Sequence, residues 1–407
     1  MNPELARRIA FTIGALLVYR LGTYIPLPGI DPAKWRIVFE QYGGEMLGAV
    51  ARLSGGGVSR LAVFSLGILP YVTAAILLQI ATFVVPSLKA IAGRGDSGRA
   101  TIHSYTLYVT IALAAFQGLG IAIGLEGVSD VVANPGWFFR FTTMLTLTAG
   151  TLFLVWLADQ ITRRGIGNGI ALLLFCGVLI ALGSAAAWMI ELQKQGALSS
   201  GIVTQASVAV VVLTGFIVVM ERARWNLVVI AAAPVAGAAG GRSLLPIKLN
   251  SAGLVPALLA SWLMTLLIVV AGYVVGWQSG RATWLLENVG HGRPLYIAIY
   301  GLLVFFGVLI YTAFVLDPEA AADTLKARGA TIEGIESGEP TADYLDGILS
   351  RISLVGAAYF TAICLIPEIL IAYTKLPFYF ASTSLLIVVC TVMDLVKQGG
   401  AHWKGKG

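Results

Sequence analysis

The stretch from Met46 to Val85 reads MLGAVARLSGGGVSRLAVFSLGILPYVTAAILLQIATFVV, and it indicates more about the fold than any other part of the chain. It is mostly apolar and about twice as long as the roughly 20 residues that one helix needs to cross a bilayer. Gly55-Gly56-Gly57, two arginines and Pro70 interrupt it. Irregular backbone at membrane depth persists only inside protein or beside water, because every N–H and C=O group needs a partner. The stretch therefore predicts a half-helix that enters a cavity, followed by a full span, as a pore with a movable stopper would need.

The composition predicts a polytopic membrane protein. The 407 residues are 57% apolar and 12% charged, and the mean hydropathy is +0.85. A soluble domain carries about 25% charged residues. The cysteines Cys176, Cys364 and Cys390 lie in apolar runs, where we expect buried small side chains rather than a disulfide or a metal site. The three histidines are scattered, so we expect neither a metal nor a cofactor.

Ten apolar segments predict ten transmembrane helices. Because Lys and Arg favour cytoplasmic loops, the distribution of the 27 basic residues places both termini in the cytoplasm. We expect the first segment, which follows Arg7-Arg8, to be a retained helix rather than a cleaved export signal. The expected spans are 9–27, 61–85, 104–124, 139–160, 169–190, 202–221, 253–275, 295–315, 350–373 and 378–396.

We expect no ionisable side chain at the centre of a span. Such a charge costs about 2.5–3.5 kcal/mol on insertion scales, and pumps accept this cost for their ion sites. Its absence argues against an ion-coupled small-solute transporter and against an intramembrane protease, so we predict that the chain is no enzyme. The run from Gly165 to Gly169 follows Arg163-Arg164 and a membrane helix, which favours a cytoplasmic turn over a phosphate-binding loop.

Seven segments, in order along the chain, resemble the SecY family, the central channel subunits of the bacterial Sec protein translocase. The resemblance implies an all-α polytopic membrane protein with ten transmembrane helices in two inverted, pseudo-symmetric halves around a central pore. It implies a protein-conducting channel that passes unfolded secretory proteins and releases hydrophobic segments sideways into the bilayer. The matching segments are Tyr24–Asp31, Ser65–Gln79, Ala149–Gly169, Leu245–Pro256, Tyr311–Leu325, Thr361–Glu368 and Pro377–Leu386.

The same resemblance divides the chain into two halves. The N-terminal half would be 1–191, with helices one to five, and the C-terminal half 202–396, with helices six to ten. An outer hinge loop at 192–201 would join them. Cytoplasmic loops are expected at 222–249 and 316–349, and a short cytoplasmic tail at 397–407.

A plug half-helix at 46–62 is implied on the outer face, and a plain re-entrant loop is the alternative. Its residues of interest are Arg52, Gly55, Gly56, Gly57 and Arg60. Pairs of residues at i and i+4 share one helix face, and a ring of apolar groups can gate a pore by dewetting. The alternative for the ring positions is ordinary core. By resemblance the pore ring is Ile68, Val72, Ile170, Leu174, Leu258 and Ile387.

A lateral gate is implied between helices two and three on one side and helices seven and eight on the other. Gln79, Gln117 and Asn250 are polar residues in or near those helices and could hold the gate closed. The alternative is that they only orient helices. Interhelical hydrogen bonds in membranes average about 0.6 kcal/mol, weak enough for a hydrophobic signal helix to open such a gate.

The resemblance also implies partners in the bacterial plasma (inner) membrane: SecE-like and SecG-like small subunits, the SecA motor ATPase or the ribosome as the energy source, preproteins with signal sequences, and membrane lipids. The docking loops depart from the family. The stretch Leu227–Gly241 carries no charge, and Glu336 stands where the family typically has an arginine. We therefore predict weakened ribosome docking, because binding to RNA depends on Lys and Arg. The docking residues are Arg222, Arg224, Arg242, Lys248, Lys326, Arg328 and Glu336.

Three interpretations of the altered loops stay open. The first is a working channel from a divergent lineage. The second is an accessory or specialised SecY paralogue with non-standard motor or ribosome coupling. The third is a scaffold that no longer conducts, which the intact ring positions and the Gly165–Gly169 turn disfavour, because a scaffold needs no apolar ring.

Overall fold

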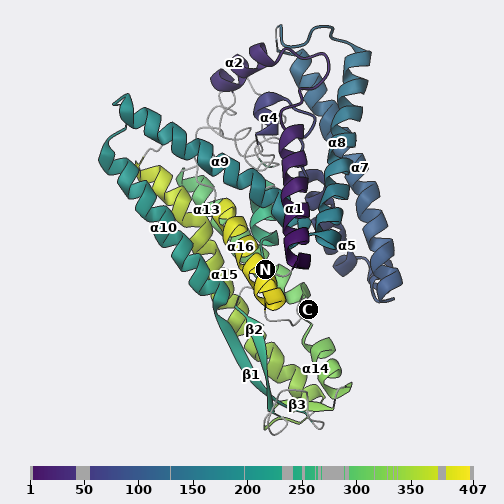
Figure 1. Cartoon of the computed structure of the whole chain (residues 1–407). Coiled ribbons are helices and arrows are strands. Elements are labelled where there is room, and N and C mark those ends of the chain that lie inside the picture. The colour runs from purple at the N-terminus through teal and green to yellow at the C-terminus, as the bar shows by residue number, and fades with distance from the viewer. Residues whose placement is uncertain are drawn as a thin grey trace. The chain divides into compact units, whose positions relative to one another are not determined.

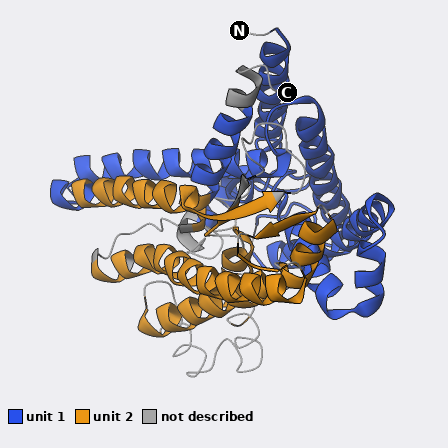
Figure 2. Ribbon diagram, turned by 90° about the horizontal axis from the view of Figure 1, so that it is seen from below, with its two compact units in different colours: residues 1–203, 387–407 blue, residues 204–386 orange. Residues whose placement is uncertain are grey.

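The computed structural model of the chain describes most of its length (Figure 1). The described residues are 3–42, 56–128, 130–196, 198–231, 242–249, 253–261, 263–264, 267, 288, 293–315, 317–327, 329–332, 334–336, 338–374 and 382–403. They divide between two compact units, 1–203 together with 387–407, and 204–386 (Figure 2).

The first unit is helical. Helices α7 and α8 pack tightly against each other where Gly118 faces Met144, since a Cβ at Gly118 would lie 3.2 Å from the Met144 Cα. Its helices are α1 (Pro3–Gly22), α2 (Pro32–Tyr42), α4 (Gly57–Arg60), α5 (Leu69–Val84), α6 (Pro86–Ala92), α7 (Asp96–Glu126), α8 (Trp137–Arg164) and α9 (Gly169–Lys194). The last helix, α16 (Ser382–Trp403), starts in the second unit and continues into the first.

The second unit combines long helices with a small sheet. Helix α10 (Ser200–Arg222) leads into strand β1 (Arg224–Ala231), which pairs antiparallel with β2 (Arg242–Lys248) and with β3 (Ala330–Ile332). The strand order is β2-β1-β3. The remaining helices are α13 (Pro294–Val315), α14 (Pro318–Ala327) and α15 (Glu339–Thr374).

The sheet was not anticipated from the sequence. Its register pairs Arg224 with Lys248 and Val229 with Ile332, so two strands come from the first expected cytoplasmic loop and the third comes from the second loop, about a hundred residues further along the chain. The buried side chains Leu227, Ile332 and Leu345 form the core beneath it. The two expected cytoplasmic loops therefore fold as one packed module.

The predicted membrane helices are largely confirmed as helices. Among the described residues, six helices are long and apolar enough to cross a membrane, and the bent pair α5 and α6, with 106° between its two parts, is a seventh candidate. The expected first and tenth spans are also helical, as α1 and α16. Of the expected seventh span, 253–275, the residues after 267 lie outside the described part of the chain, as do 262, 265 and 266.

Two expected boundaries are wrong: the start of the second span and the end of the first. The second span starts at Leu69 rather than 61, because Leu61 and Gly67 have φ values of 45° and 58°, which a right-handed helix cannot contain. Pro70 then stands in the first turn of α5, where its missing N–H costs nothing. Helix α1 ends at Gly22, and the first span therefore does not reach residue 27.

Large apolar side chains remain exposed along the long helices. On α10, Val208, Val211, Val212 and Val219 are each more than half exposed. A soluble monomer rarely leaves so continuous an apolar surface in water, whereas lipid chains cover it without cost. The surface is that of a helix facing hydrocarbon.

Candidate functional site

The end of the interrupted stretch, residues 56–68, forms a compact segment that we name the plug base. It is hydrogen-bonded to the loop that follows α1. The backbone bonds run from Leu27 N to Leu61 O (2.8 Å) and from Val63 N to Ile25 O (2.9 Å), with a bridge between Pro26 and Ala62. The indole Nε1–H of Trp35 also donates to the Val58 carbonyl over 3.1 Å. The segment therefore has a fixed attachment.

Glycine and serine allow the tight turn inside the plug base. The buried Ser65 Oγ lies 2.9 Å from the Gly57 carbonyl oxygen and 2.6 Å from that of Ala62. A Cβ at Gly57 would lie 2.9 Å from the Phe64 carbonyl oxygen, which is backbone and cannot rotate away. Gly56 has φ of 81°, a conformation that favours glycine. The conformation thus explains why this segment begins with glycines.

Aromatic rings hold the plug base against α1 and α8. Phe64 stacks on Phe153 of α8, with ring centres 5.8 Å apart, and on Tyr19 of α1 at 6.3 Å. Any side chain at Gly22 would overlap the Phe64 ring, and one at Gly150 would overlap the Val63 carbonyl. Small residues on both helices therefore make room for this segment.

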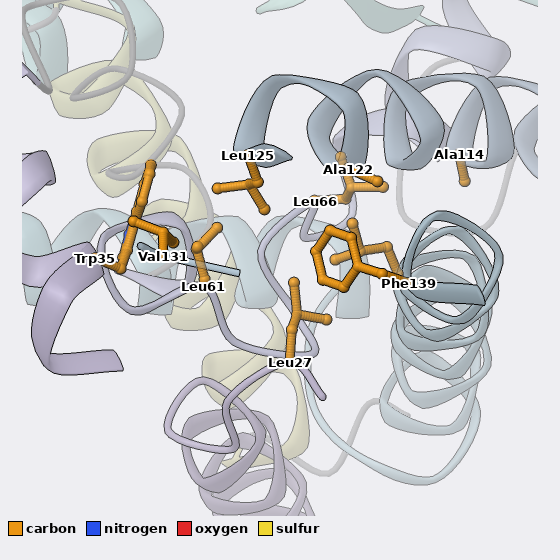
Figure 3. Close-up of a cluster of buried hydrophobic side chains, with 10 residues drawn as sticks. Leu27, Trp35, Leu61, Leu66, Ala114, Ala122, Leu125, Val131 and Phe139 are labelled. Atoms are coloured by element: carbon orange, nitrogen blue, oxygen red, sulfur yellow. The ribbon is translucent and has the colours of Figure 1, made fainter. Parts of the chain in front are cut away.

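Beneath the plug base lies a cluster of buried apolar side chains (Figure 3). Leu61 and Leu66 of the plug base belong to this cluster. Leu27 joins it from the loop after α1, and Trp35 joins it from α2. The other members belong to α7, α8 and the loop between them: Ala114, Ala122, Leu125, Val131, Phe139 and Leu147. The contributions of Leu27 and Trp35 were not predicted from the sequence, although Leu27 lies within the Tyr24–Asp31 segment and Trp35 follows it.

Arg60 is the described plug residue that carries charge. Its guanidinium carbon lies over the Tyr24 ring, and Arg20 also lies close to that ring. The buried Nη1 of Arg60 has no hydrogen-bond partner among the residues that the structure describes. Arg52, Gly55 and the rest of the expected plug before residue 56 lie outside the described residues.

The turn between α8 and α9 is fixed by caps from several helices. Asn168 Oδ1 accepts from Ile170 N (3.0 Å) and Ala171 N (3.2 Å), and so caps α9. Other side chains bind the remaining turn amides: Thr12 Oγ1 accepts from Ile166 N (3.0 Å), Gln398 Oε1 from Gly167 N (2.8 Å) and Thr162 Oγ1 from Gly169 N (2.8 Å). The segment is a turn, and it fixes the position at which α9 begins.

These two fixed turns present the expected ring positions of the first unit. Ile68 immediately precedes α5, and its carbonyl accepts from Val72 N over 3.1 Å. Ile170 and Leu174 follow the capped turn on α9. Ile68, Leu174 and Ile387 are buried, whereas Val72, Ile170 and Leu258 are half-buried, and Leu258 belongs to the second unit.

The gate and docking positions are only partly described. Gln79 on α5 and Gln117 on α7 are half-buried, on helices that pack against each other, while Asn250 lies outside the described residues. Glu336 is exposed, and its carbonyl accepts from Thr341 Oγ1. Of the basic docking positions, Arg328 is not described, and the others lie at the end of α10, on the hairpin or on α14: Arg222, Arg224, Arg242, Lys248 and Lys326.

One ionisable residue inside an expected span, away from its centre, was not considered in the sequence-based prediction. Glu368 lies in α15 within the expected span 350–373, directly after Pro367, and it is completely buried. The sequence carried a signal, because it is the only carboxylate in that apolar run. The free thiols of Cys176, Cys364 and Cys390 are buried or half-buried, as expected.

Comparison with known proteins decides the family. The SecY family model matches residues 62–396. The chain belongs to the SecY family. It is 43% identical to the protein translocase subunit SecY of Escherichia coli (strain K12), over 97% of this chain and 91% of the relative. The SecY subunit of Vibrio cholerae is 40% identical over 98% and 92% of the two chains.

Solved structures share the SecY fold. A structure described as that of a protein conducting channel matches with a TM-score of 0.66 at 17% identity, and covers 98% of this chain and 93% of that chain. Sec61 in the canine ribosome-channel complex matches with a TM-score of 0.65 at 16% identity, with the same coverage. Homologous channels are thus seen in ribosome complexes.

Membership of the SecY family confirms the predicted class of fold and of function. The chain is a mostly helical, multi-pass membrane protein and a protein-conducting translocation channel, and it is a channel subunit rather than an enzyme.

Proposed function

We propose that this channel closes its pore with two elements, the plug at 46–62 and the ring of Ile68, Val72, Ile170, Leu174, Leu258 and Ile387. The observation that supports the proposal most directly is the pair of fixed turns, 56–68 and 165–169, each of which leads into a helix whose first turns carry an apolar pair at i and i+4. Both pairs present branched side chains without polar atoms. Such a ring holds neither water nor an ion, and it can yield around a passing chain.

The plug base supplies the fixed end about which the rest of the plug moves. Its hydrogen bonds to residues 25–35 and its stacking on Tyr19 and Phe153 favour retention of this segment when the plug is displaced. Arg60 lies near the edge of the fixed part, where its guanidinium contacts the Tyr24 ring.

The channel also sorts its substrates sideways. The lateral gate lies between helices two and three and helices seven and eight, with Gln79, Gln117 and Asn250 as its polar contacts. Leu, Ile, Phe and Val each gain about 0.3–0.6 kcal/mol on insertion, and a central Lys or Asp costs about 2.5–3.5 kcal/mol. A segment of about 20 apolar residues therefore leaves into lipid, and a polar segment continues through the pore.

The two halves, 1–191 and 202–396, open about the loop at 192–201. This loop joins α9 to α10 and is short, with Leu198 N donating to Leu192 O over 3.2 Å. We place the protein in the bacterial plasma membrane with both termini cytoplasmic. Its partners are SecE-like and SecG-like subunits, unfolded preproteins and the SecA motor.

Ribosome docking is weakened in this chain. The hairpin of β1 and β2 carries Arg224 and Lys248 at its base and Arg242 near the far end of the paired strands. The exposed residues of α14, of the turn before α15 and of the start of α15 are rich in carboxylates, including Glu319, Asp323 and Glu336. Repulsion from RNA phosphates then lowers affinity. The alternative is a specialised SecY paralogue, which the same loops favour.

Translocation in proteoliposomes tests the proposal. The vesicles contain this chain and its own SecE-like subunit, with and without the SecA and ATP of the same organism. A secretory preprotein protected from protease only when the motor is present supports a SecA-driven channel in which Glu336 is tolerated. No protection, while a standard SecY works in parallel, would overturn this coupling and support the specialised paralogue.

A further inference from the structure

Glu368 is a buried carboxyl residue in a membrane helix, and neither the plug, the ring nor the gate explains it. It lies in α15 after Pro367 and is 0% exposed. A carboxyl group inside hydrocarbon is costly unless it is hydrogen-bonded or neutral. Ionisable residues in membrane helices therefore mark functional positions as a rule.

The surroundings of Glu368 bring polar groups from three helices together within the second unit. Tyr300 of α13 lies at the level of Cys364 and Glu368 on α15, because a Cβ at its neighbour Gly301 would lie 3.0 Å from a methyl group of Leu365, which stands between those two residues. The Tyr300 hydroxyl lies 3.4 Å from Ser261 Oγ, which belongs to the helical segment 255–261. The rings of Tyr296 and Tyr300 stack with their centres 5.6 Å apart. Tyr300 is thus the central member, and it is almost completely buried.

Helices α13 and α15 approach closely at the same level. They lie side by side (Figure 1), and a Cβ at Gly301 would lie 3.0 Å from a methyl group of Leu365. Small residues permit such close contact between membrane helices. The two helices therefore form one rigid pair, to which Ser261 attaches the segment 255–261.

We propose that Ser261, Tyr300 and Glu368 form a polar clamp that makes the segment 255–261 move together with α13 and α15. The inference rests on the proposed lateral gate, in which helices seven and eight form one side. With the clamp intact, opening displaces all three helices and their lipid contacts. With the clamp broken, the segment 255–261 moves alone, and a less hydrophobic signal segment opens the gate.

The test measures the hydrophobicity at which a segment leaves the channel. The full chain, purified with its co-purifying subunits, is placed in proteoliposomes and given substrates with a graded number of leucines in a test segment. Tyr300→Phe and Ser261→Ala should each lower the threshold for release by about one or two leucines, since an interhelical hydrogen bond of about 0.6 kcal/mol equals the insertion free energy of that many leucines. Glu368→Gln should lower the threshold as well. The double variant Tyr300→Phe with Ser261→Ala should shift it no further than Tyr300→Phe alone, because Tyr300→Phe already removes the bond to Ser261.

Tyr359→Phe is the matched control. Tyr359 is also buried on α15, and its hydroxyl lies 3.5 Å from Glu221 Oε1, outside the clamp. The Tyr359→Phe variant should release test segments at the same leucine content as the unmodified chain. An equal shift in this control, or unchanged thresholds in all three clamp variants, would overturn the clamp. If Tyr300→Phe fails to accumulate, Ser261→Ala, at a half-buried position, carries the same test. An unmodified channel that releases no segment at any leucine content would overturn the gate, and the clamp with it.

Discussion

The guanidinium carbon of Arg60 lies 4.2 Å from the centre of the Tyr24 ring, and that of Arg20 lies 4.5 Å from the same centre. One exposed aromatic ring therefore attracts two cations, one from the plug base and one from α1. Because both guanidinium groups lie within 4.5 Å of one ring centre, they are closer to each other than the Debye length of about 10 Å at 0.1 M salt. Their positive charges therefore repel each other. The contact holds Arg60 beside Arg20, whose charge also repels it, so it is a weak attachment near the edge of the fixed plug base.

Removing the Tyr24 ring should loosen the closed plug. A cation–π contact at an exposed site contributes about 0.5–1 kcal/mol, so Tyr24→Leu should shift the balance between closed and displaced plug about two- to fivefold. Ion conductance of the resting channel in planar bilayers measures this shift. Tyr24→Phe retains the ring and should conduct like the unmodified protein, and equal resting conductance for Tyr24→Leu would contradict the contact's role.

A methyl group at Gly57 should destabilise the plug base. Its Cβ would meet the Phe64 carbonyl oxygen at 2.9 Å, and overpacking against fixed backbone costs about 1–3 kcal/mol. The melting temperature of the purified complex should fall for Gly57→Ala. Gly120→Ala on α7, where the structure places nothing within 4 Å, should melt at or slightly above the unmodified value. Identical melting of the two variants would show that the close approach at Gly57 is absent in the membrane.

Loss of the cap on α9 should disturb the ring positions that follow it. Asn168→Ala removes the acceptor for Ile170 N and Ala171 N and should cost about 0.5–2 kcal/mol of stability. Asn168→Asp retains an acceptor and suits the positive end of the helix dipole, so it should keep stability and translocation rate. Thermal melting and protease protection of a preprotein check both variants. If a destabilised Asn168→Ala protein translocates at the full rate, the cap contributes to stability but does not position the pore ring.

Reversing the charge at Glu336 should strengthen ribosome docking. Glu336→Arg replaces an exposed repulsive group by one that can neutralise a phosphate, so affinity should rise and its dependence on salt should steepen. Cosedimentation with ribosomes across a salt series measures both. Glu319→Arg on α14 makes the same change of net charge and is the control. An equal gain in the control would assign the effect to net charge rather than to this turn.

The long helices could be predicted from the sequence, but the contacts that join distant segments could not. Apolar runs of spanning length predicted α7 to α10, because hydrocarbon leaves a helix few alternatives. The interruption of the apolar stretch before α5 was predicted from its glycines and Pro70. The contact between Tyr24 and Arg60 was not, since nothing local marks a cation that stacks on a ring 36 residues away. Glu368 was overlooked because a single carboxyl in an apolar run barely changes its hydropathy.

The pairing of β1 with β3 has a consequence for the order of biosynthesis. Strands that are hydrogen-bonded lie on one side of the membrane, so the chain between Lys248 and Ala330 must cross the bilayer an even number of times. The third strand exists only after the ribosome has synthesised α13 and that helix has entered the bilayer. A truncated or half-inserted chain can present the hairpin but not the completed sheet. A partner that binds the three-stranded surface would thereby distinguish a finished channel from a nascent one.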